Sequence, residues 1–278
     1  MTNWNRKRMR ERYTLATASP EPDEHFESRW TRLDGLRLHH RATRVDPPGR
    51  VPVLLVHGLA VSHRYLMPLA AELAGEHPVR VVDMPGFGLS DDPKPALGVP
   101  ALADRLAEWL TATGTAPAAV LGNSFGAQVA SALAVRHPEL VQSLILVGPT
   151  MDPRARTKTR QALRWLRGIP SEDPSQLPIV LRDLVDAGAR RAWRTFGIAL
   201  DDRIERRLPE VAAPTLVTRG AAEAVAPQRW VEEIVDLLPH GELAVVPEGP
   251  HDGTYTTAEE LAALVLPFLE RTTADRTG

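Results

Sequence analysis

The stretch LGNSFGAQ, residues 121–128, places glycines on both sides of one serine directly after an apolar run. Gly122 and Gly126 flank Ser124, between an expected buried strand (AAVLGNS) and an expected helix (GAQVASALAVRHP). A turn this tight strains its central residue, and a Cβ at either glycine would collide with the strand or the helix. The Ser124 hydroxyl would then stand at the helix N-terminus, where the dipole favours negative charge. The pattern therefore predicts a nucleophilic serine rather than an ordinary serine with glycine neighbours.

Apolar runs and helical periodicities alternate on both sides of this turn. The segment 28–44 alternates around an Asp-Gly pair and predicts a hairpin. Strands buried on both faces are expected at VPVLLVHG (51–58), VRVVDMPG (79–86), VQSLILVGPT (141–150), APTLVTRG (213–220) and ELAVVPEGPH (242–251), with helical patterns between most of them. This alternation predicts an α/β fold with a parallel sheet, helices on both faces, and ligands at the carboxyl ends of the strands.

The alternation stops after residue 150 and resumes near residue 208. Residues 151–207 contain helical patterns without a convincing strand, so we expect a helical cap (a lid) over the sheet edge that carries Ser124. The predicted domain organisation is a flexible, charged N-terminal segment (1–24), a core formed by 25–150 and 208–278, and the cap at 151–207.

Composition excludes several classes of function. The chain has 278 residues, 43% hydrophobic and 24% charged, with a formal charge of −2, which does not suggest a nucleic-acid surface. It has no cysteine, which excludes disulfides, thiolate metal sites and a cysteine nucleophile. No apolar run approaches the roughly 18 residues that span a membrane, and the basic N-terminus lacks the apolar part of a signal peptide. We expect a cytoplasmic protein with a small-molecule substrate and no cofactor, metal or membrane partner. Whether it forms a homo-oligomer stays open.

A serine needs a base, and the base needs an acid. His251 ends the last expected strand and points to the same sheet edge as Ser124, whereas His57 and His63 fit a loop and a helix start better. Two acids are open for the third role: Glu223, after the strand TLVTRG, and Asp152, where the cap begins.

The oxyanion of an acyl-transfer reaction needs two backbone N–H donors. We expect one from Phe125, the residue after the serine, and one from Leu59, in the HGLAVS loop after the first buried strand.

These motifs together resemble the α/β-hydrolase superfamily, and specifically its capped, serine-nucleophile, esterase- or lactonase-like members. The resemblance covers residues 28–270 and rests on HGL (57–59), DMPGFGLS (83–90), GNSFG (122–126) and His251. It implies the α/β-hydrolase fold, a mostly parallel eight-stranded sheet flanked by helices, with a helical cap inserted after strand 6, and the order Ser124, Glu223, His251. The chain departs from the family at GAAEA (220–224), where members usually carry Gly-x-x-Asp-Pro. Some relatives place the acid where Asp152 stands, and a site lacking the acid is the remaining alternative.

The expected cap contains aromatic and basic side chains. Trp165, Trp193 and Phe196 are predicted to line the substrate pocket, with the packing of the cap onto the core as the alternative. Five arginines are expected to form the solvated face of one helix: Arg154, Arg156, Arg160, Arg164 and Arg167.

Three hypotheses about function follow. The first is a serine hydrolase that cleaves a small-to-medium apolar ester, lactone or thioester through an acyl-enzyme. The second keeps the fold for C–C bond hydrolysis or a non-hydrolytic tailoring or cyclisation step, and is motivated by the unusual Glu223 loop. The third is a ligand-binding protein in which the triad is a relic.

Overall fold

The computed structural model describes residues 25–247, 249–251 and 253–274, so the predicted flexible segment at 1–24 lies outside the described residues. Eight strands form one sheet in the order β1-β2-β4-β3-β5-β6-β7-β8. The strands are β1 (Phe26–Leu33), β2 (Leu36–Thr43), β3 (Val53–Val56), β4 (Val79–Val82), β5 (Ala118–Asn123), β6 (Val141–Val147), β7 (Thr215–Gly220) and β8 (Gly241–Val246). From β4 to β8 all neighbours in the sheet are parallel, and the two strands before them are antiparallel. The predicted fold class is therefore confirmed.

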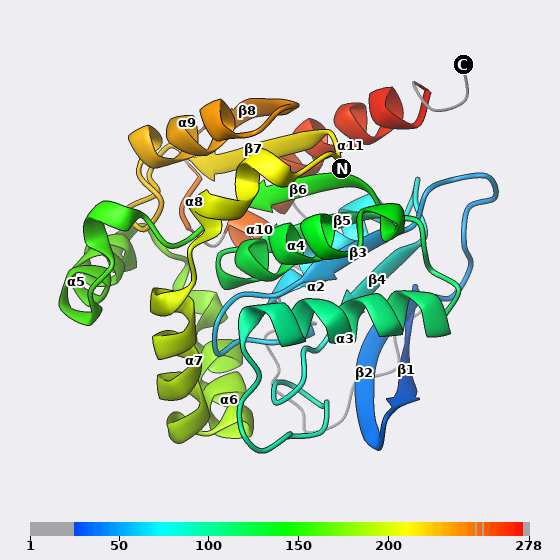
Figure 1. Cartoon of the computed structure of the whole chain (residues 1–278), viewed down its shortest axis with the longest axis horizontal. Helices are drawn as coiled ribbons and strands as arrows, with labels where there is room; N and C mark the ends of the chain where they lie inside the picture. The colour runs from blue at the N-terminus through cyan, green and yellow to red at the C-terminus, as the bar shows by residue number, and fades with distance from the viewer. Residues whose placement is uncertain (1–24, 248, 252, 275–278) are drawn as a thin grey trace.

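Helices cover both faces of this sheet (Figure 1). They are α2 (His63–Leu73), α3 (Val99–Ala112), α4 (Phe125–Arg136), α5 (Lys158–Gly168), α6 (Leu177–Ala187), α7 (Ala189–Asp201), α8 (Ile204–Arg207), α9 (Gln228–Leu237), α10 (Gly253–Thr256) and α11 (Ala258–Ala274). Short 3-10 turns are η1 (Pro138–Leu140), η2 (Pro153–Ala155), η3 (Ile169–Ser171), η4 (Pro174–Gln176) and η5 (Leu208–Glu210). Helices α5 to α8 are inserted between β6 and β7. No helix in the described ranges is both long and apolar enough to cross a bilayer.

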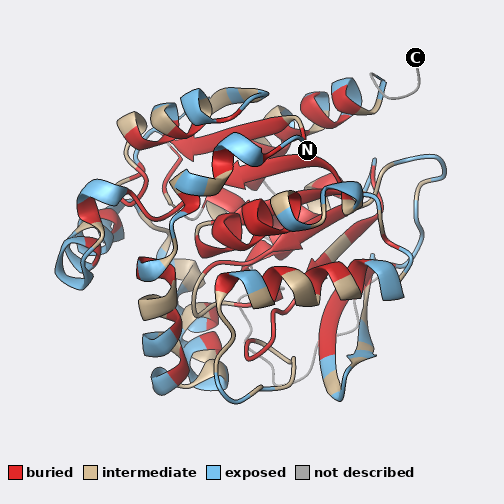
Figure 2. Ribbon diagram, viewed as in Figure 1, coloured by how far each residue is buried: buried red, intermediate tan, exposed pale blue. Residues whose placement is uncertain are grey.

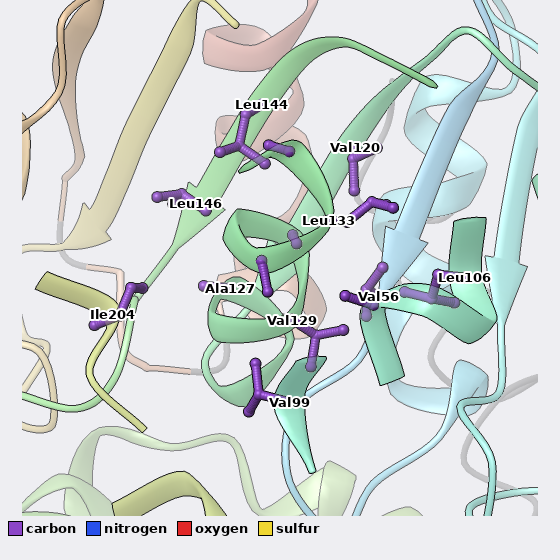
Figure 3. Close-up of a cluster of buried hydrophobic side chains, with 14 of the residues drawn as sticks. Val56, Val99, Leu106, Val120, Ala127, Val129, Leu133, Leu144, Leu146 and Ile204 are labelled. Carbon is purple, nitrogen blue, oxygen red and sulfur yellow. The ribbon is translucent and has the colours of Figure 1, made fainter. Parts of the chain in front are cut away.

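The strand residues alternate between two hydrophobic clusters, one on each face of the sheet. Val56, Val120 and Leu146 belong to the cluster under α3, α4 and α9 (Figure 3). Their neighbours Leu55 and Leu121 belong to the cluster under α2 and α11. Because successive side chains of a strand point to opposite faces, a strand covered on both sides must be apolar throughout. The continuous apolar runs of the sequence have this cause.

The first hairpin forms where the sequence predicts it. Strands β1 and β2 pair up to Leu33 and Leu36. Asp34 and Gly35 between them have φ values of 45° and 84°. Positive φ at both central residues is typical of the type I′ turn, which matches the twist of the strands that it joins.

Candidate active site

Ser124 lies on the turn between β5 and α4 with φ 53° and ψ −113°, a conformation that is costly for a residue with a side chain. The neighbouring glycines explain how the turn closes. A Cβ at Gly122 would lie 2.4 Å from the carbonyl oxygen of Gly126, and a Cβ at Gly126 would lie 2.3 Å from that of Val56. The Ser124 amide donates to the carbonyl of Val147 on the next strand at 2.9 Å. The turn is therefore fixed by the packing of backbone against backbone.

His251 stands between Ser124 and Glu223. Its Nε2 lies 3.1 Å from Ser124 Oγ, and its Nδ1 lies 2.6 Å from Glu223 Oε2. The side chain of Glu223 is 1% exposed and that of His251 is 17% exposed. A buried carboxylate on Nδ1 fixes the tautomer in which Nε2 carries a lone pair. The arrangement therefore allows the imidazole to accept the hydroxyl proton of Ser124.

The other oxygen of Glu223 is held by its own loop. Oε1 accepts from the amides of Val225 and Ala226 at 2.7 and 3.0 Å. Burial alone would raise the pKa of Glu223, but the interaction with His251 and the two amide bonds outweigh it, so the pKa lies below its ordinary value. Glu223 is consequently ionised when it faces His251.

Arg219, a residue of β7, shapes the loop that carries Glu223. Its Nη2 donates to the Glu223 carbonyl at 2.8 Å, and its Nε donates to the Ala226 carbonyl at 3.1 Å. Both bonds are made by one rigid guanidinium, which sets two points of the loop relative to the strand. The longer glutamate thereby reaches the histidine from a loop that lacks the usual aspartate and proline.

Asp152, the second acid that the sequence leaves open, is occupied elsewhere. Its Oδ2 accepts from Arg164 and Arg229 at 2.6 Å each, and its Oδ1 accepts from the Arg154 amide at 2.9 Å. The carboxylate thus joins α5 and α9 to the start of the insertion. Of the two candidate acids, Glu223 is the one bonded to His251.

Two further glycines leave room for the site: Gly148, which the sequence analysis does not single out, and Gly58 of the HGL motif. A Cβ at Gly148, which has φ 51°, would lie 3.0 Å from Glu223 Oε2 and 3.1 Å from His251 Nδ1. A Cβ at Gly58 would lie 3.4 Å from Ser124 Cβ. A side chain at either position would crowd the three residues, so both glycines leave room for the site. For Gly148 the only sequence signal is a glycine directly after a buried strand.

The two expected oxyanion donors lie in the segments that approach Ser124. Phe125 is the first residue of α4, and the first amides of a helix have no acceptor within the helix. Leu59 follows Gly58, whose close approach to Ser124 brings this loop to the serine. Both assignments stay predictions about the amides that would face a tetrahedral intermediate.

The start of α2, next to the Leu59 loop, is tied to three other parts of the molecule. Ser62 Oγ donates to Asp183 of α6 at 2.8 Å, and Arg64 forms an ion pair with the same carboxylate. Tyr65 Oη donates to Asn123 Oδ1, beside Ser124. Asp183 is 1% exposed although it lies on an inserted helix. No pattern in the sequence indicates this link between the insertion and the loop.

The third tie is Asp83 after β4, which collects hydrogen bonds from separate segments. It accepts from His39 Nδ1 at 2.8 Å, from the His63 amide at 2.7 Å and from the Leu89 amide at 3.0 Å, and His63 Nδ1 lies 2.8 Å from it. Burial alone would raise the pKa of Asp83, but both imidazoles outweigh it and hold the pKa well below its usual value. Among the described residues, His39, His63 and Asp83 form the one group with ligand types and spacing for a cation. Since both Nδ1 atoms already bond to the carboxylate, we interpret the group as a structural hub.

The expected pocket residues of the insertion differ in exposure. Trp165 is 57% exposed and Trp193 is 59% exposed, whereas Phe196 is partly buried against the core. Their role in substrate binding stays a prediction.

The five arginines do not share one solvated face. Arg154 and Arg156 precede α5, and Arg156 and Arg164 pair with Glu205 and Asp152.

Comparisons with known proteins agree with this architecture. A family model of the α/β hydrolase fold matches residues 51–174. A polyketide synthase of Burkholderia thailandensis is 30% identical over 250 residues, which are 81% of this chain and 12% of the synthase. The chain therefore spans only a small part of that relative. The pimeloyl-[acyl-carrier protein] methyl ester esterase of Neisseria meningitidis serogroup B is 29% identical, and the match covers 83% of this chain and 97% of the esterase.

Solved structures show the same fold. A bacterial membrane phospholipase A superposes with a TM-score of 0.78 at 22% identity, covering 97% of this chain and 90% of that one. The eight-stranded sheet, the glycine-flanked serine turn and these similarities together show that the chain has the α/β-hydrolase fold.

Proposed function

We propose that the chain is a serine hydrolase that cleaves a small-to-medium apolar carboxylic ester, lactone or thioester through an acyl-enzyme. The observation that carries the proposal is the continuous row of hydrogen bonds from Glu223 through His251 to Ser124. A hydroxyl, an imidazole and a carboxylate in this order are the parts that acyl transfer to serine requires. The likeness to a methyl ester esterase supports an ester as substrate.

The proposed mechanism follows from the geometry. Ser124 Oγ attacks the substrate carbonyl while His251 Nε2 takes the hydroxyl proton, and Glu223 stabilises the imidazolium that forms. The amides of Leu59 and Phe125 bind the oxyanion. His251 then gives the proton to the departing alcohol or thiol. In the second half it activates a water that attacks the acyl-enzyme and releases the acid.

No observation favours the alternatives over this reaction. C–C bond hydrolysis or a tailoring step was motivated by the Glu223 loop, but Glu223 hydrogen bonds with His251 despite its unusual sequence. A ligand-binding protein with a relic triad has no need to keep a carboxylate 1% exposed against the ring. Such a group is costly to bury unless its charge is used or paired.

The test combines turnover with covalent labelling. The purified protein should hydrolyse a generic aryl ester, and Ser124→Ala should lower kcat by about 10⁴ or more. A fluorophosphonate probe should label the wild type on Ser124 and leave Ser124→Ala unlabelled. Ser131→Ala is a matched control, because Ser131 is buried in α4 and donates only to the Gln128 carbonyl. Equal turnover by the wild type and Ser124→Ala would refute the proposal.

A further inference from the structure

The inserted helices expose an unusual share of the large apolar side chains. Of the thirteen exposed large hydrophobic residues among those that the structure describes, nine lie between residues 163 and 193. They are Leu163, Trp165, Leu166, Ile169, Leu177, Leu181, Leu184, Val185 and Trp193. Figure 2 shows the contrast between these helices and the buried strands. Exposed apolar side chains that are concentrated in one segment make that segment a candidate interaction site.

Helix α5 packs on the protein with its polar side and exposes its apolar side, which is the opposite of an ordinary amphipathic helix. The side that it buries consists of Gln161 and Gly168, and Arg164 next to them bonds to Asp152 and to the Val225 carbonyl. Leu163, Trp165 and Leu166 of α5 and Ile169 directly after it are exposed, and the pairs 163/166, 166/169 and 165/169 have i+3 or i+4 spacing, so they form one stripe. A surface helix normally turns such a stripe toward the core.

Helix α6 repeats the arrangement. It buries Ile179 and Asp183, while Leu177, Leu181, Leu184 and Val185 again form an exposed stripe at i+3 and i+4 spacing. Two consecutive inserted helices that each turn an apolar stripe outward, while the buried side of each includes polar residues, are not explained by packing of the fold.

The same segment is cationic. Residues 151–200 contain ten Lys or Arg against five Asp or Glu, a net charge of +5, so the rest of a chain with total charge −2 carries −7. Arg160 and Arg167 are exposed beside the α5 stripe, and Lys158 lies 4.1 Å from the Trp193 ring centroid. An apolar stripe with tryptophan, flanked by arginine and lysine, is typical of helices that lie in the interface of a membrane.

We propose that the exposed stripes of α5 and α6, with the cations beside them (the interfacial face), bind an anionic lipid–water interface. A second copy of the chain fits less well, because two positively charged faces would repel. An acidic protein could pair with the arginines, but its charged surface would leave the two apolar stripes uncovered. A lipid interface accommodates both, since acyl chains take the apolar side chains and anionic headgroups take the cations.

The interfacial face is tied to the site through α5. Arg164 bonds to the Val225 carbonyl, and the Val225 amide holds Glu223. In Figure 1, α5 projects beyond the sheet from the segment that follows β6. Resting on the proposed function, the inference names the substrate class as amphiphilic esters that are presented at an interface.

Vesicle binding tests the face independently of turnover. Ser124→Ala protein is sedimented with vesicles of mixed phosphatidylglycerol and phosphatidylcholine, and with vesicles of phosphatidylcholine alone. We expect binding to the mixed vesicles that weakens with salt. Adding Trp165→Glu and Leu166→Glu should reduce the affinity by about tenfold or more. Arg160→Gln with Arg167→Gln should reduce binding to the anionic vesicles and flatten the salt dependence.

The matched control adds Val45→Glu and Leu237→Glu, which introduce the same charges at exposed apolar positions outside the insertion. This control should bind like its parent, and thermal unfolding should show each variant folded. The inference is overturned if mixed vesicles do not bind, or if the Trp165→Glu, Leu166→Glu protein binds equally well. It is also overturned if those substitutions leave vesicle binding unchanged and instead abolish binding to an acidic acyl carrier protein or self-association. Vesicle binding without ester turnover would refute the proposed function alone.

Discussion

Replacing Glu223 by glutamine should abolish most activity while leaving the fold intact. The glutamine carbonyl oxygen can keep the two amide bonds from Val225 and Ala226 that Oε1 accepts at 2.7 and 3.0 Å. Its NH2 group then faces His251 Nδ1, which must accept a hydrogen bond instead of donating one. The ring proton moves to Nε2, so Nε2 can no longer accept the proton of Ser124. An aspartate-to-asparagine change with this effect lowers kcat by about 10⁴ in serine hydrolases.

The expected loss for Glu223→Gln is therefore about 10³ to 10⁴ in kcat, or about 4 to 5 kcal/mol in the activation barrier, with little change in KM. The assay is steady-state hydrolysis of an aryl ester, with the thermal midpoint of each protein measured alongside. Since both amide bonds remain, the midpoint should move by only about a few degrees.

Asp152→Asn tests the other acid that the sequence allows as the partner of His251. It removes a charge that pairs with Arg164 and Arg229, so it should cost about 1 to 3 kcal/mol of unfolding free energy. Because Asp152 is not bonded to His251, kcat should stay within about threefold of the wild type. If Glu223→Gln keeps kcat within tenfold while Asp152→Asn loses it, the reasoning from the hydrogen bonds is refuted.

Two further changes test the packing and the buried charge. Gly126→Ala should lower the unfolding free energy in urea by about 3 kcal/mol or more, because its Cβ would meet the Val56 carbonyl, whereas Gly197→Ala in α7, with open space around its Cβ, should not. Equal stability of the two variants would contradict this. For Asp183, burial raises the pKa to about 6, and Arg64 offsets this only in part. A raised carboxyl pKa gives stability that is present below the ordinary value of 3.8 and is lost as pH rises through 6. The unfolding free energy of the wild type minus that of Asp183→Asn should thus fall by about 3 kcal/mol from pH 4 to pH 8, and a difference independent of pH would contradict it.

The sheet could be predicted because its signals are local. Apolar runs of four to seven residues, the Asp34–Gly35 turn and the glycines around Ser124 each describe their own segment. His251 could be chosen because it follows the last strand of the sheet, although β8 ends at Val246 and is shorter than the sequence predicts. For these features the sequence neighbours and the spatial neighbours are the same.

The remaining features depend on contacts between distant residues. Glu223 could not be separated from Asp152 by sequence, because Arg219 and the amides of Val225 and Ala226 orient it. Likewise, helical periodicity identifies an apolar stripe but not the direction in which a helix faces. Helix α5 is held through Arg164 and Gln161, so Arg164, which was expected in solvent, is partly buried and the apolar stripe is exposed.

The contact of Ser62 and Arg64 with Asp183 has a consequence for attempts to change specificity by exchanging the insertion with that of a relative. A transplanted α6 without an acid at position 183 would leave the Ser62 hydroxyl and the Arg64 guanidinium without this partner next to the Leu59 loop. Chimeras should therefore take α2 and α6 from the same parent protein. Partner residues on these two helices should be the first matched when donors for such grafts are chosen.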